Sequence, residues 1–201
     1  TRVLARGFRV DDVFTIARKV RERSQVPLAV MVSYSIVYRY GGERFVTNAQ
    51  AAGIDGAVLP DLGVADGKDL LDLAAGRDFK TVLLVAPTTE PEREREIIEH
   101  ATGFVYCISV VGITGARDRL PAELAGHVKR LRTLTDKPIC VGFGVSKPEH
   151  VRTVSEIADG VIVGSAIVKQ IARHADDRAK MLAELSRFVT DLTAPLRAGR
   201  P

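Results

Sequence analysis

Glycine and hydroxyl-bearing residues stand directly after several short apolar runs of this sequence. The clearest examples are Gly112-Ile113-Thr114-Gly115, Gly142-Phe143-Gly144 and Gly164-Ser165. A glycine lets a ligand approach the main chain closely, and the free N–H groups at the start of a helix attract an anion. Taken singly, each glycine is more often a turn residue than a ligand contact. Together they predict a phosphate site formed by main-chain donors near Gly144, Gly164 and Ser165.

The apolar runs themselves predict six buried strands, whose first residues are 22 to 34 positions apart. They are residues 27–32, 54–59, 81–86, 104–109, 138–142 and 160–163. Segments with the period of a helix lie between them, as Phe45, Val46, Ala49 and Ala52 illustrate. Strands that are apolar on both faces and alternate with amphipathic helices are typical of a parallel sheet covered by helices.

Three patterns predict where helices begin. Asp11 is a candidate cap for a first helix that contains Phe14 and Ala17. Thr89-Glu90-Pro91 and Ser146-Lys147-Pro148 each place a capping hydroxyl ahead of a proline in the first turn.

A repeated strand–helix unit of this length fits either a (β/α)₈ barrel or an open, doubly wound sheet. The open sheet usually shows a GxGxxG sequence after an early strand, and residues 112–115 lack that spacing. Regular strand spacing and glycine-ended strands favour the barrel. A closed barrel needs eight strands, whereas this sequence shows six and opens with a helix. We therefore expect a TIM-barrel type of fold with about six of the eight units.

The composition limits the kinds of partner that the protein is expected to bind. The chain has 201 residues, 46% of them hydrophobic, and no linker divides residues 1–201, which predicts one domain. Lys and Arg number 29 against 25 Asp and Glu, interspersed in runs such as Glu92-Arg93-Glu94-Arg95-Glu96. With 5% aromatic residues, this argues against a nucleic-acid partner.

No apolar stretch approaches the roughly 18 residues that cross a bilayer. Cys107 and Cys140 each lie inside an apolar run, which argues against a disulfide scaffold or a metal site. The sequence predicts a cytoplasmic globular protein without a membrane partner, either an enzyme or a ligand-binding relative of one.

Five strings resemble the tryptophan synthase alpha subunit in their order and spacing. They are VLPDL (58–62), VAPTT (85–89), GFVYCIS with GITGAR (103–117), VGFGVS with PEHV (141–151) and ADGVIVGSAIV (158–168). The resemblance covers residues 1 to about 196. It implies a TIM barrel that cleaves indole-3-glycerol phosphate to indole and glyceraldehyde 3-phosphate in tryptophan biosynthesis. It also implies an alpha2beta2 complex with a beta subunit, which holds the pyridoxal phosphate, so that this chain carries no cofactor.

The resemblance implies a phosphate site and a reaction site in this chain. The phosphate contacts fall at Gly115, Gly144, Gly164 and Ser165. Thr114 matches the loop threonine that bonds to the catalytic aspartate when the site closes.

The resemblance also assigns roles to four other residues. Tyr106 matches the strand tyrosine beside the catalytic glutamate, while Tyr34 and Phe143 match residues that line the indole pocket. Asp61 matches an aspartate in the loop that communicates with the beta subunit. On the residues alone, each tyrosine could be a core residue with a bonded hydroxyl, and Asp61 a helix cap after Pro60.

The family's general acid and base are the main departure. The retro-aldol cleavage needs both in reach of the substrate. In the family they are a glutamate that ends the first strand and an aspartate after the second strand. Both regions precede the part of the family that matches Thr1. We therefore expect that these residues are a fragment that lacks the two amino-terminal units and shows no cleavage by itself. The alternative is an intact protein that has lost both acids.

Three functions remain open at this point. The first is the alpha-type lyase, complete only when the amino-terminal units are supplied. The second is a non-catalytic subunit that binds a phosphate ligand and modulates a beta-type partner. The third, another phosphosugar barrel enzyme, agrees with fewer of the motifs.

Overall fold

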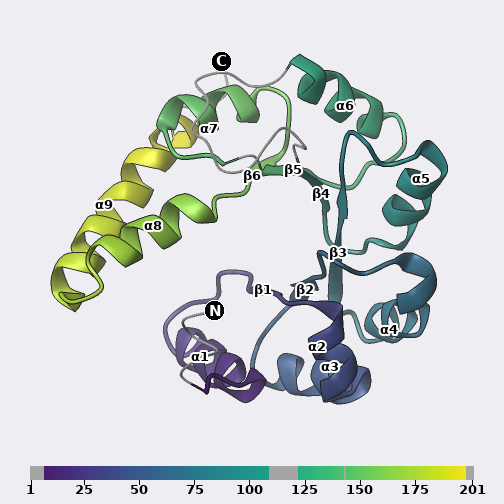
Figure 1. Cartoon of the computed structure of the whole chain (residues 1–201), viewed down its shortest axis with the longest axis horizontal. Coiled ribbons are helices and arrows are strands. Elements are labelled where there is room, and N and C mark those ends of the chain that lie inside the picture. Colours follow the sequence, from purple (N-terminus) through teal and green to yellow (C-terminus); the bar gives the residue numbers. More distant parts are fainter. Residues whose placement is uncertain (1–6, 109–121, 143, 198–201) are drawn as a thin grey trace. The chain divides into compact units, whose positions relative to one another are not determined.

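The computed structural model describes residues 7–108, 122–142 and 144–197, and Figure 1 shows the elements that they form. The chain divides into two compact units. Unit 1 contains residues 1–83 and 96–103, and unit 2 contains residues 84–95 and 104–201.

In unit 1, three strands pair in parallel, in the order in which they follow along the chain. Ala29 pairs with Gly56, and Gly56 pairs with Lys80. The elements are α1 (Val10–Arg21), β1 (Ala29–Met31), α2 (Tyr34–Tyr40), α3 (Gly42–Ala51), β2 (Gly56–Val58), α4 (Val64–Gly76) and β3 (Lys80–Val85), and α5 (Pro91–His100) ends in this unit.

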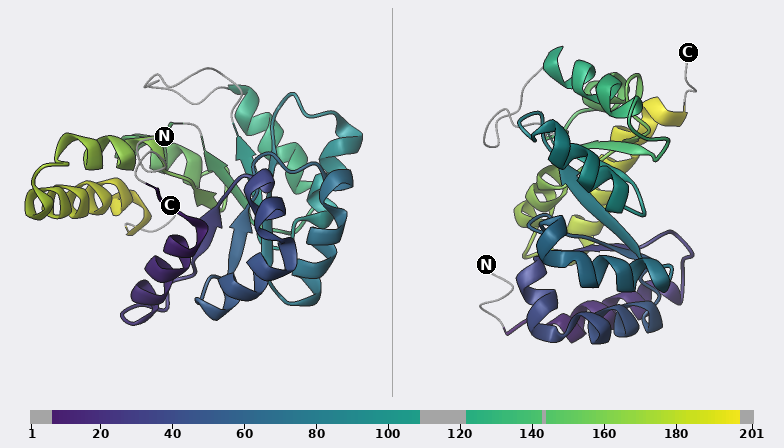
Figure 2. Two further views of the ribbon diagram at one scale, coloured as in Figure 1. Left: turned by 60° about the horizontal axis from the view of Figure 1, so that its bottom comes forward. Right: turned by 90° about the vertical axis from the view of Figure 1, so that its right-hand side faces the viewer.

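Unit 2 repeats the same arrangement. Val105 of its first strand pairs in parallel with Ile139 of the second, and Cys140 pairs with Gly160 of the third. The elements are β4 (Val105–Ile108), α6 (Ala122–Arg132), β5 (Ile139–Gly142), α7 (Pro148–Ser155), β6 (Gly160–Val161), α8 (Ser165–Arg173) and α9 (Arg178–Arg197). The two views in Figure 2 show helices flanking these strands. The predicted α/β class with parallel strands is confirmed, and each of the six predicted runs overlaps a strand. The predicted burial is wrong for β1, in which Ala29 and Met31 are exposed.

For α5 and α7, the predicted proline in the first turn is confirmed, but the predicted capping hydroxyls are wrong. Pro91 and Pro148 open α5 and α7 as expected. The Thr89 hydroxyl, however, accepts the N–H of Ala86 at 2.9 Å, within the turn that precedes α5. Lys147, not Ser146, precedes α7.

The first helix also starts earlier than predicted. It begins at Val10, and Asp11 lies in its first turn. The carboxylate of Asp12 accepts the Arg9 N–H at 2.7 Å and fixes that start.

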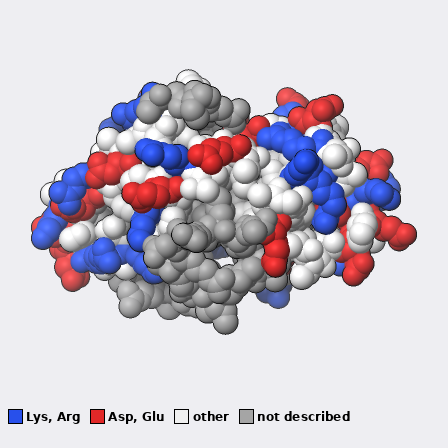
Figure 3. Space-filling view, turned by 90° about the horizontal axis from the view of Figure 1, so that it is seen from above, with Lys and Arg blue, Asp and Glu red and all other residues white. Residues whose placement is uncertain are grey.

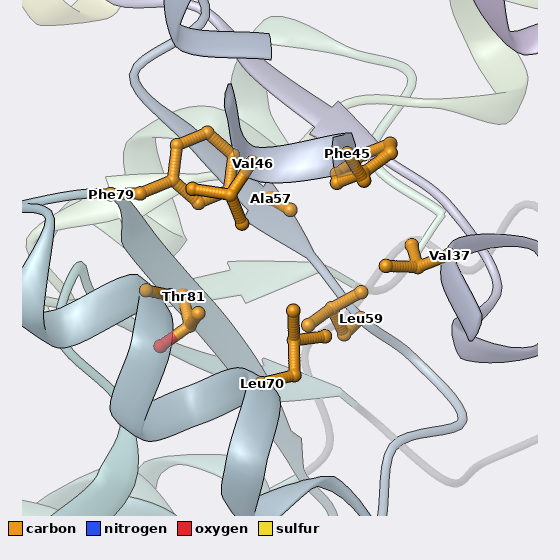
Figure 4. A pocket seen from close by; sticks show the side chains of 9 residues that line it. Val37, Phe45, Val46, Ala57, Leu59, Leu70, Phe79 and Thr81 are labelled. Atoms are coloured by element: carbon orange, nitrogen blue, oxygen red, sulfur yellow. The ribbon is translucent and has the colours of Figure 1, made fainter. Parts of the chain in front are cut away.

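The core of unit 1 is built from apolar side chains of α2, α3, α4 and the strands. Phe45 of α3 packs at ring distances of 5.8 Å from Phe14 of α1 and 6.5 Å from Phe79. Figure 4 shows Phe45 and Phe79 among the side chains around a small apolar hollow. Its lining residues are Val37, Phe45, Val46, Ala57, Leu59, Leu70, Ala74, Phe79 and Thr81.

One aspartate of unit 1 links the segments that lead into β1 and β2. Asp55 and Leu28 exchange two hydrogen bonds: the Asp55 N–H donates to the Leu28 carbonyl at 2.8 Å, and the Leu28 N–H donates to Asp55 Oδ2 at 2.7 Å. Arg21, the last residue of α1, donates to the same oxygen at 2.5 Å. This aspartate therefore joins the approaches to two strands and one helix end.

Unit 2 contains the same arrangement at the same place. Asp159 and Ile139 exchange main-chain and side-chain hydrogen bonds of 2.9 and 2.8 Å. Arg132, the last residue of α6, pairs with Asp159 Oδ2 at 2.6 Å. We call each arrangement an Arg–Asp clamp.

We predict that Asp55→Ala lowers the free energy of unfolding by about 1–2 kcal/mol, because a strand-start N–H and an arginine lose their acceptor. Urea unfolding at neutral pH measures the change. Asp72→Ala is the matched control, since its pair with Lys68 is exposed and joins neighbouring turns of α4. Equal midpoints for the two variants would contradict the role of the Asp55 clamp.

Candidate functional site

The structure places four of the predicted site residues in unit 2 and two in unit 1. Tyr106 lies in β4, Gly144 follows β5, and Gly164 and Ser165 follow β6. Tyr34 and Asp61 belong to unit 1. Thr114, Gly115 and Phe143 lie outside the described residues.

The loops that carry Gly144 and Gly164 leave from neighbouring strands at the same end. Val141 of β5 pairs with Val161 of β6, and the Ile162 N–H donates to the Val141 carbonyl at 2.8 Å. Both glycines are exposed, and a Cβ added at either one would meet no atom within 4 Å. A side chain at either position would therefore point into open space.

The two glycines differ in their backbone conformation. Gly144 has a φ of +76°, in the left-handed region that favours glycine. Gly164 has a φ of −119°, which any residue adopts. Local geometry therefore accounts for glycine at position 144 and leaves the choice of glycine at position 164 unexplained by the fold.

Helix α8 begins directly at this place. Ser165 is its first residue, and Gly164, which precedes it, has no side chain to cap the first turn. First-turn N–H groups have no acceptor inside a helix, and the dipole makes this end positive. The start of α8 can therefore donate hydrogen bonds to an anion.

Tyr106 lies on the opposite side of β4 from the buried Val105 and Cys107. Its ring passes very close to Gly142, the last residue of β5: a Cβ added at Gly142 would be 2.6 Å from the phenol oxygen and 2.8 Å from Cε2. Burial raises the pKa of the Tyr106 phenol, which therefore stays protonated at neutral pH. Gly142 thus provides the space that this tyrosine occupies, a role that the sequence analysis missed.

In unit 1, Asp61 joins the loop after β2 to the start of α2. Its carboxylate accepts the Ser33 hydroxyl at 2.5 Å and the Tyr34 N–H at 2.7 Å. These two hydrogen bonds, with that of Ser33 first, hold the pKa of Asp61 below its ordinary value. Asp61 therefore caps α2, rather than a helix after Pro60.

Tyr34 is the first residue of α2. Its hydroxyl donates to the Asp66 carbonyl at 3.0 Å, and its ring lies 6.1 Å from that of Tyr38. The hydroxyl thus links α2 to the first turn of α4.

A buried polar cluster in unit 2 was not predicted. Glu94 of α5 is 1% exposed and accepts hydrogen bonds from two residues of α6. Arg130 donates to both of its oxygens, at 3.2 and 2.9 Å, and His127 Nε2 lies 2.6 Å from Oε1. The other ring nitrogen, Nδ1, lies 3.6 Å from the Cys107 Sγ. We call Cys107, His127, Glu94 and Arg130 the buried polar line.

The charges at the surface are mixed. Figure 3 shows basic and acidic side chains side by side over the face it presents. Within the described ranges, no group of three His, Cys, Asp or Glu side chains could hold a metal ion. None of the helices in those same ranges is long and apolar enough to cross a membrane.

Parallel strands, intervening helices and glycine-bearing loops at the carboxyl ends of strands define an α/β protein of repeated β/α units. Proteins of this class bind their ligands at that end of the strands. The chain belongs to the tryptophan synthase alpha chain family, whose profile matches residues 1–196.

Individual relatives agree with this assignment. The tryptophan synthase alpha chain of Thermococcus kodakarensis is 43% identical over 198 residues, which are 98% of this chain and 77% of that protein. The alpha chain of Caldanaerobacter subterraneus subsp. tengcongensis is 38% identical over 95% of this chain and 72% of its own length.

Solved structures from Pyrococcus furiosus are also similar. A mutant of its tryptophan synthase alpha-subunit matches with a TM-score of 0.85 and 36% identity, over 95% of this chain and 76% of that one. The alpha chain in its tryptophan synthase α2β2 complex matches with a TM-score of 0.87 and 38% identity over the same shares.

Proposed function

We propose that this chain contributes to the alpha-type reaction of tryptophan synthase, the cleavage of indole-3-glycerol phosphate to indole and glyceraldehyde 3-phosphate. Family membership gives the reaction class. The observation that carries the site is the pair of open glycine loops after β5 and β6, beside the uncapped start of α8. Main-chain N–H groups at that place suit the phosphate of the substrate.

The proposed roles follow the resemblance residue by residue. Gly115, Gly144, Gly164 and Ser165 contact the phosphate. Thr114 and Tyr106 support the reaction.

The remaining roles concern the indole and the partner. Tyr34 and Phe143 line the indole pocket, and Asp61 belongs to the surface that meets a beta-type subunit. An α2β2 assembly like that of the Pyrococcus furiosus enzyme is the proposed arrangement, with the pyridoxal phosphate in the beta subunit.

We propose a (β/α)₈-type barrel of which these 201 residues, as a single partial domain, supply about six units. The general acid and base of the family have no counterpart that we identify among these residues. The purified 201-residue chain is therefore expected to bind a glycerol phosphate without cleaving indole-3-glycerol phosphate. A chromatographic assay for indole measures this, and indole above the buffer background would contradict it.

A single charge placed at Gly164 tests the phosphate site. We predict that Gly164→Asp weakens glycerol 3-phosphate binding at least about tenfold, or about 1.4 kcal/mol, because the new carboxylate meets the phosphate. Titration calorimetry measures the affinity, and thermal unfolding of the same variant checks that it is folded.

Gly164→Asn is the matched control, because it has nearly the same shape without the charge. We expect its affinity to stay much closer to that of the original chain. Equal affinities for the Asp and Asn variants would remove the phosphate assignment. No binding by the original chain would remove it as well.

A further inference from the structure

The buried polar line connects residues of three elements, all of them in unit 2, because α5 begins in unit 2 and ends in unit 1. Cys107 lies on the face of β4 that is covered by helices, Glu94 on α5, and His127 with Arg130 on α6. Cys107, His127 and Glu94 are at most 3% exposed, whereas about half of the Arg130 side chain reaches solvent. The line therefore runs from the surface through the helix pair to the strand.

With a neutral His127 ring, each hydrogen bond of this line has one direction. A carboxylate only accepts, so His127 Nε2 carries its proton and donates to Glu94. In the neutral ring Nδ1 is then an acceptor, and the Cys107 S–H is the donor that faces it. Glu94 thus selects the tautomer of His127 that can bind the thiol.

The arrangement of thiol, imidazole and carboxylate resembles that of a nucleophile with its base. Cys107 does not fit this role, because it is fully buried. Burial first, and then the charge of Glu94, raise the pKa of the thiol to about 12, so it remains an S–H donor. A structural role for the line is therefore better supported than a nucleophilic one.

The neighbour of Cys107 on the strand is Tyr106, which points to the opposite face. Consecutive side chains of a strand point to opposite faces. A contact that fixes the distance of Cys107 from the helices therefore also fixes how far Tyr106 projects from the other face. The ring of Tyr106 lies over Gly142, so close that a Cβ added at Gly142 would be 2.6 Å from its oxygen. A small shift of β4 toward or away from the helices would change this fit.

We infer that Glu94 and His127 are positioning residues for Tyr106: through the Cys107 thiol they hold β4 at the depth at which the tyrosine ring fits over Gly142. This inference rests on the site role proposed for Tyr106. The direct contact to the strand is the thiol–imidazole hydrogen bond, and Glu94 and Arg130 act only through His127.

Nuclear magnetic resonance of the full 201-residue chain, labelled with ¹³C at the tyrosine rings, tests the inference without any ligand. The chain has four tyrosines, and Tyr106→Phe identifies the Tyr106 signal. Cys107→Val fills the space of the thiol but cannot donate, and we expect it to shift or split the Tyr106 signal. Cys107→Ser keeps a donor for His127 and should leave the signal close to its original position.

Val105→Ala is the matched control for packing alone. Val105 lies on the same strand and the same buried face, and it takes no part in the polar line. We expect this variant to lose stability while Tyr106 keeps its signal. Overlapping signals in Cys107→Val and the original chain would overturn the inference, as would equal shifts in Cys107→Val and Val105→Ala. Because the readout needs no substrate, this failure is distinct from the loss of phosphate binding that would refute the proposed function.

Discussion

Replacement of Glu94 by alanine is expected to lower the free energy of unfolding by about 3 kcal/mol. The change removes the acceptor of His127, which is 3% exposed and would keep an unsatisfied N–H. Breaking a buried ion pair by removing one partner typically costs about 3–5 kcal/mol. The lower end applies here because Arg130 is half exposed and can be hydrated instead. Urea unfolding at neutral pH measures the loss.

The surface pair of Glu184 and Arg187 provides the control for this variant. Both residues lie on α9, and 71% of the Arg187 side chain is exposed. Glu184→Ala should therefore change the stability very little. If Glu94→Ala and Glu184→Ala unfold at the same urea concentration, the buried polar line does not stabilise unit 2.

The same carboxylate predicts a dependence of stability on pH. Burial alone would raise the pKa of Glu94, but the hydrogen bonds from Arg130 and His127 outweigh it and hold the pKa below its ordinary value of 4.5. A group with a lowered pKa in the folded state stabilises the fold above its unfolded pKa. This contribution is lost as the pH falls below 4.5, through the lowered value. Glu94→Gln should therefore show a shallower loss of stability over that acidic range.

Gly142→Ala is expected to lower the free energy of unfolding by about 1–3 kcal/mol, because the new methyl group overlaps the Tyr106 ring. Tyr106→Leu removes the atoms that collide. In the Tyr106→Leu background, Gly142→Ala should therefore cost much less. A double-mutant cycle by urea unfolding should give a coupling of about 1–3 kcal/mol.

Gly126 offers the same substitution with the opposite expected sign. It lies inside α6, and a Cβ added there would meet no atom within 4 Å. Alanine at this position should raise the stability by about 0.5–1 kcal/mol, because it favours the helix.

Additive effects of Gly142→Ala and Tyr106→Leu in the double-mutant cycle would contradict the close approach between these two residues.

The periodicity of the sequence was sufficient to predict the strands. The apolar runs mark the strands even though the depth of burial differs, from β2, which is buried throughout, to β1, whose Ala29 and Met31 are exposed. The start of α2 could not be predicted in this way. Its capping group is Asp61, which is 27 residues away from Tyr34 in the sequence and reaches it only in the folded chain.

Glu94 shows a second limit of the sequence. It stands in the alternating run Glu92-Arg93-Glu94-Arg95-Glu96, which is typical of an exposed helix face. Its burial depends on partners that lie 33 and 36 positions further along the chain. Gly142 is similar, because the need for glycine arises from the ring of a residue on the neighbouring strand.

The positions of the glycine loops at the ends of strands could be predicted from the sequence. The uncapped start of α8 and the open glycine loops lie where the pattern of glycine after an apolar strand placed them. Whether a ligand binds there is a question of donor directions and charge that residue types alone do not answer.

In unit 2, the Arg132–Asp159 clamp lies at the amino ends of β5 and β6, whereas Gly144, Gly164 and Ser165 lie beyond the carboxyl ends of the same strands. The anchoring contacts and the candidate ligand loops therefore lie at opposite ends of these strands. Insertions or substitutions in the loops of Gly144 and Gly164 should leave the clamp contacts intact. These loops are therefore the place where a new binding specificity could be introduced.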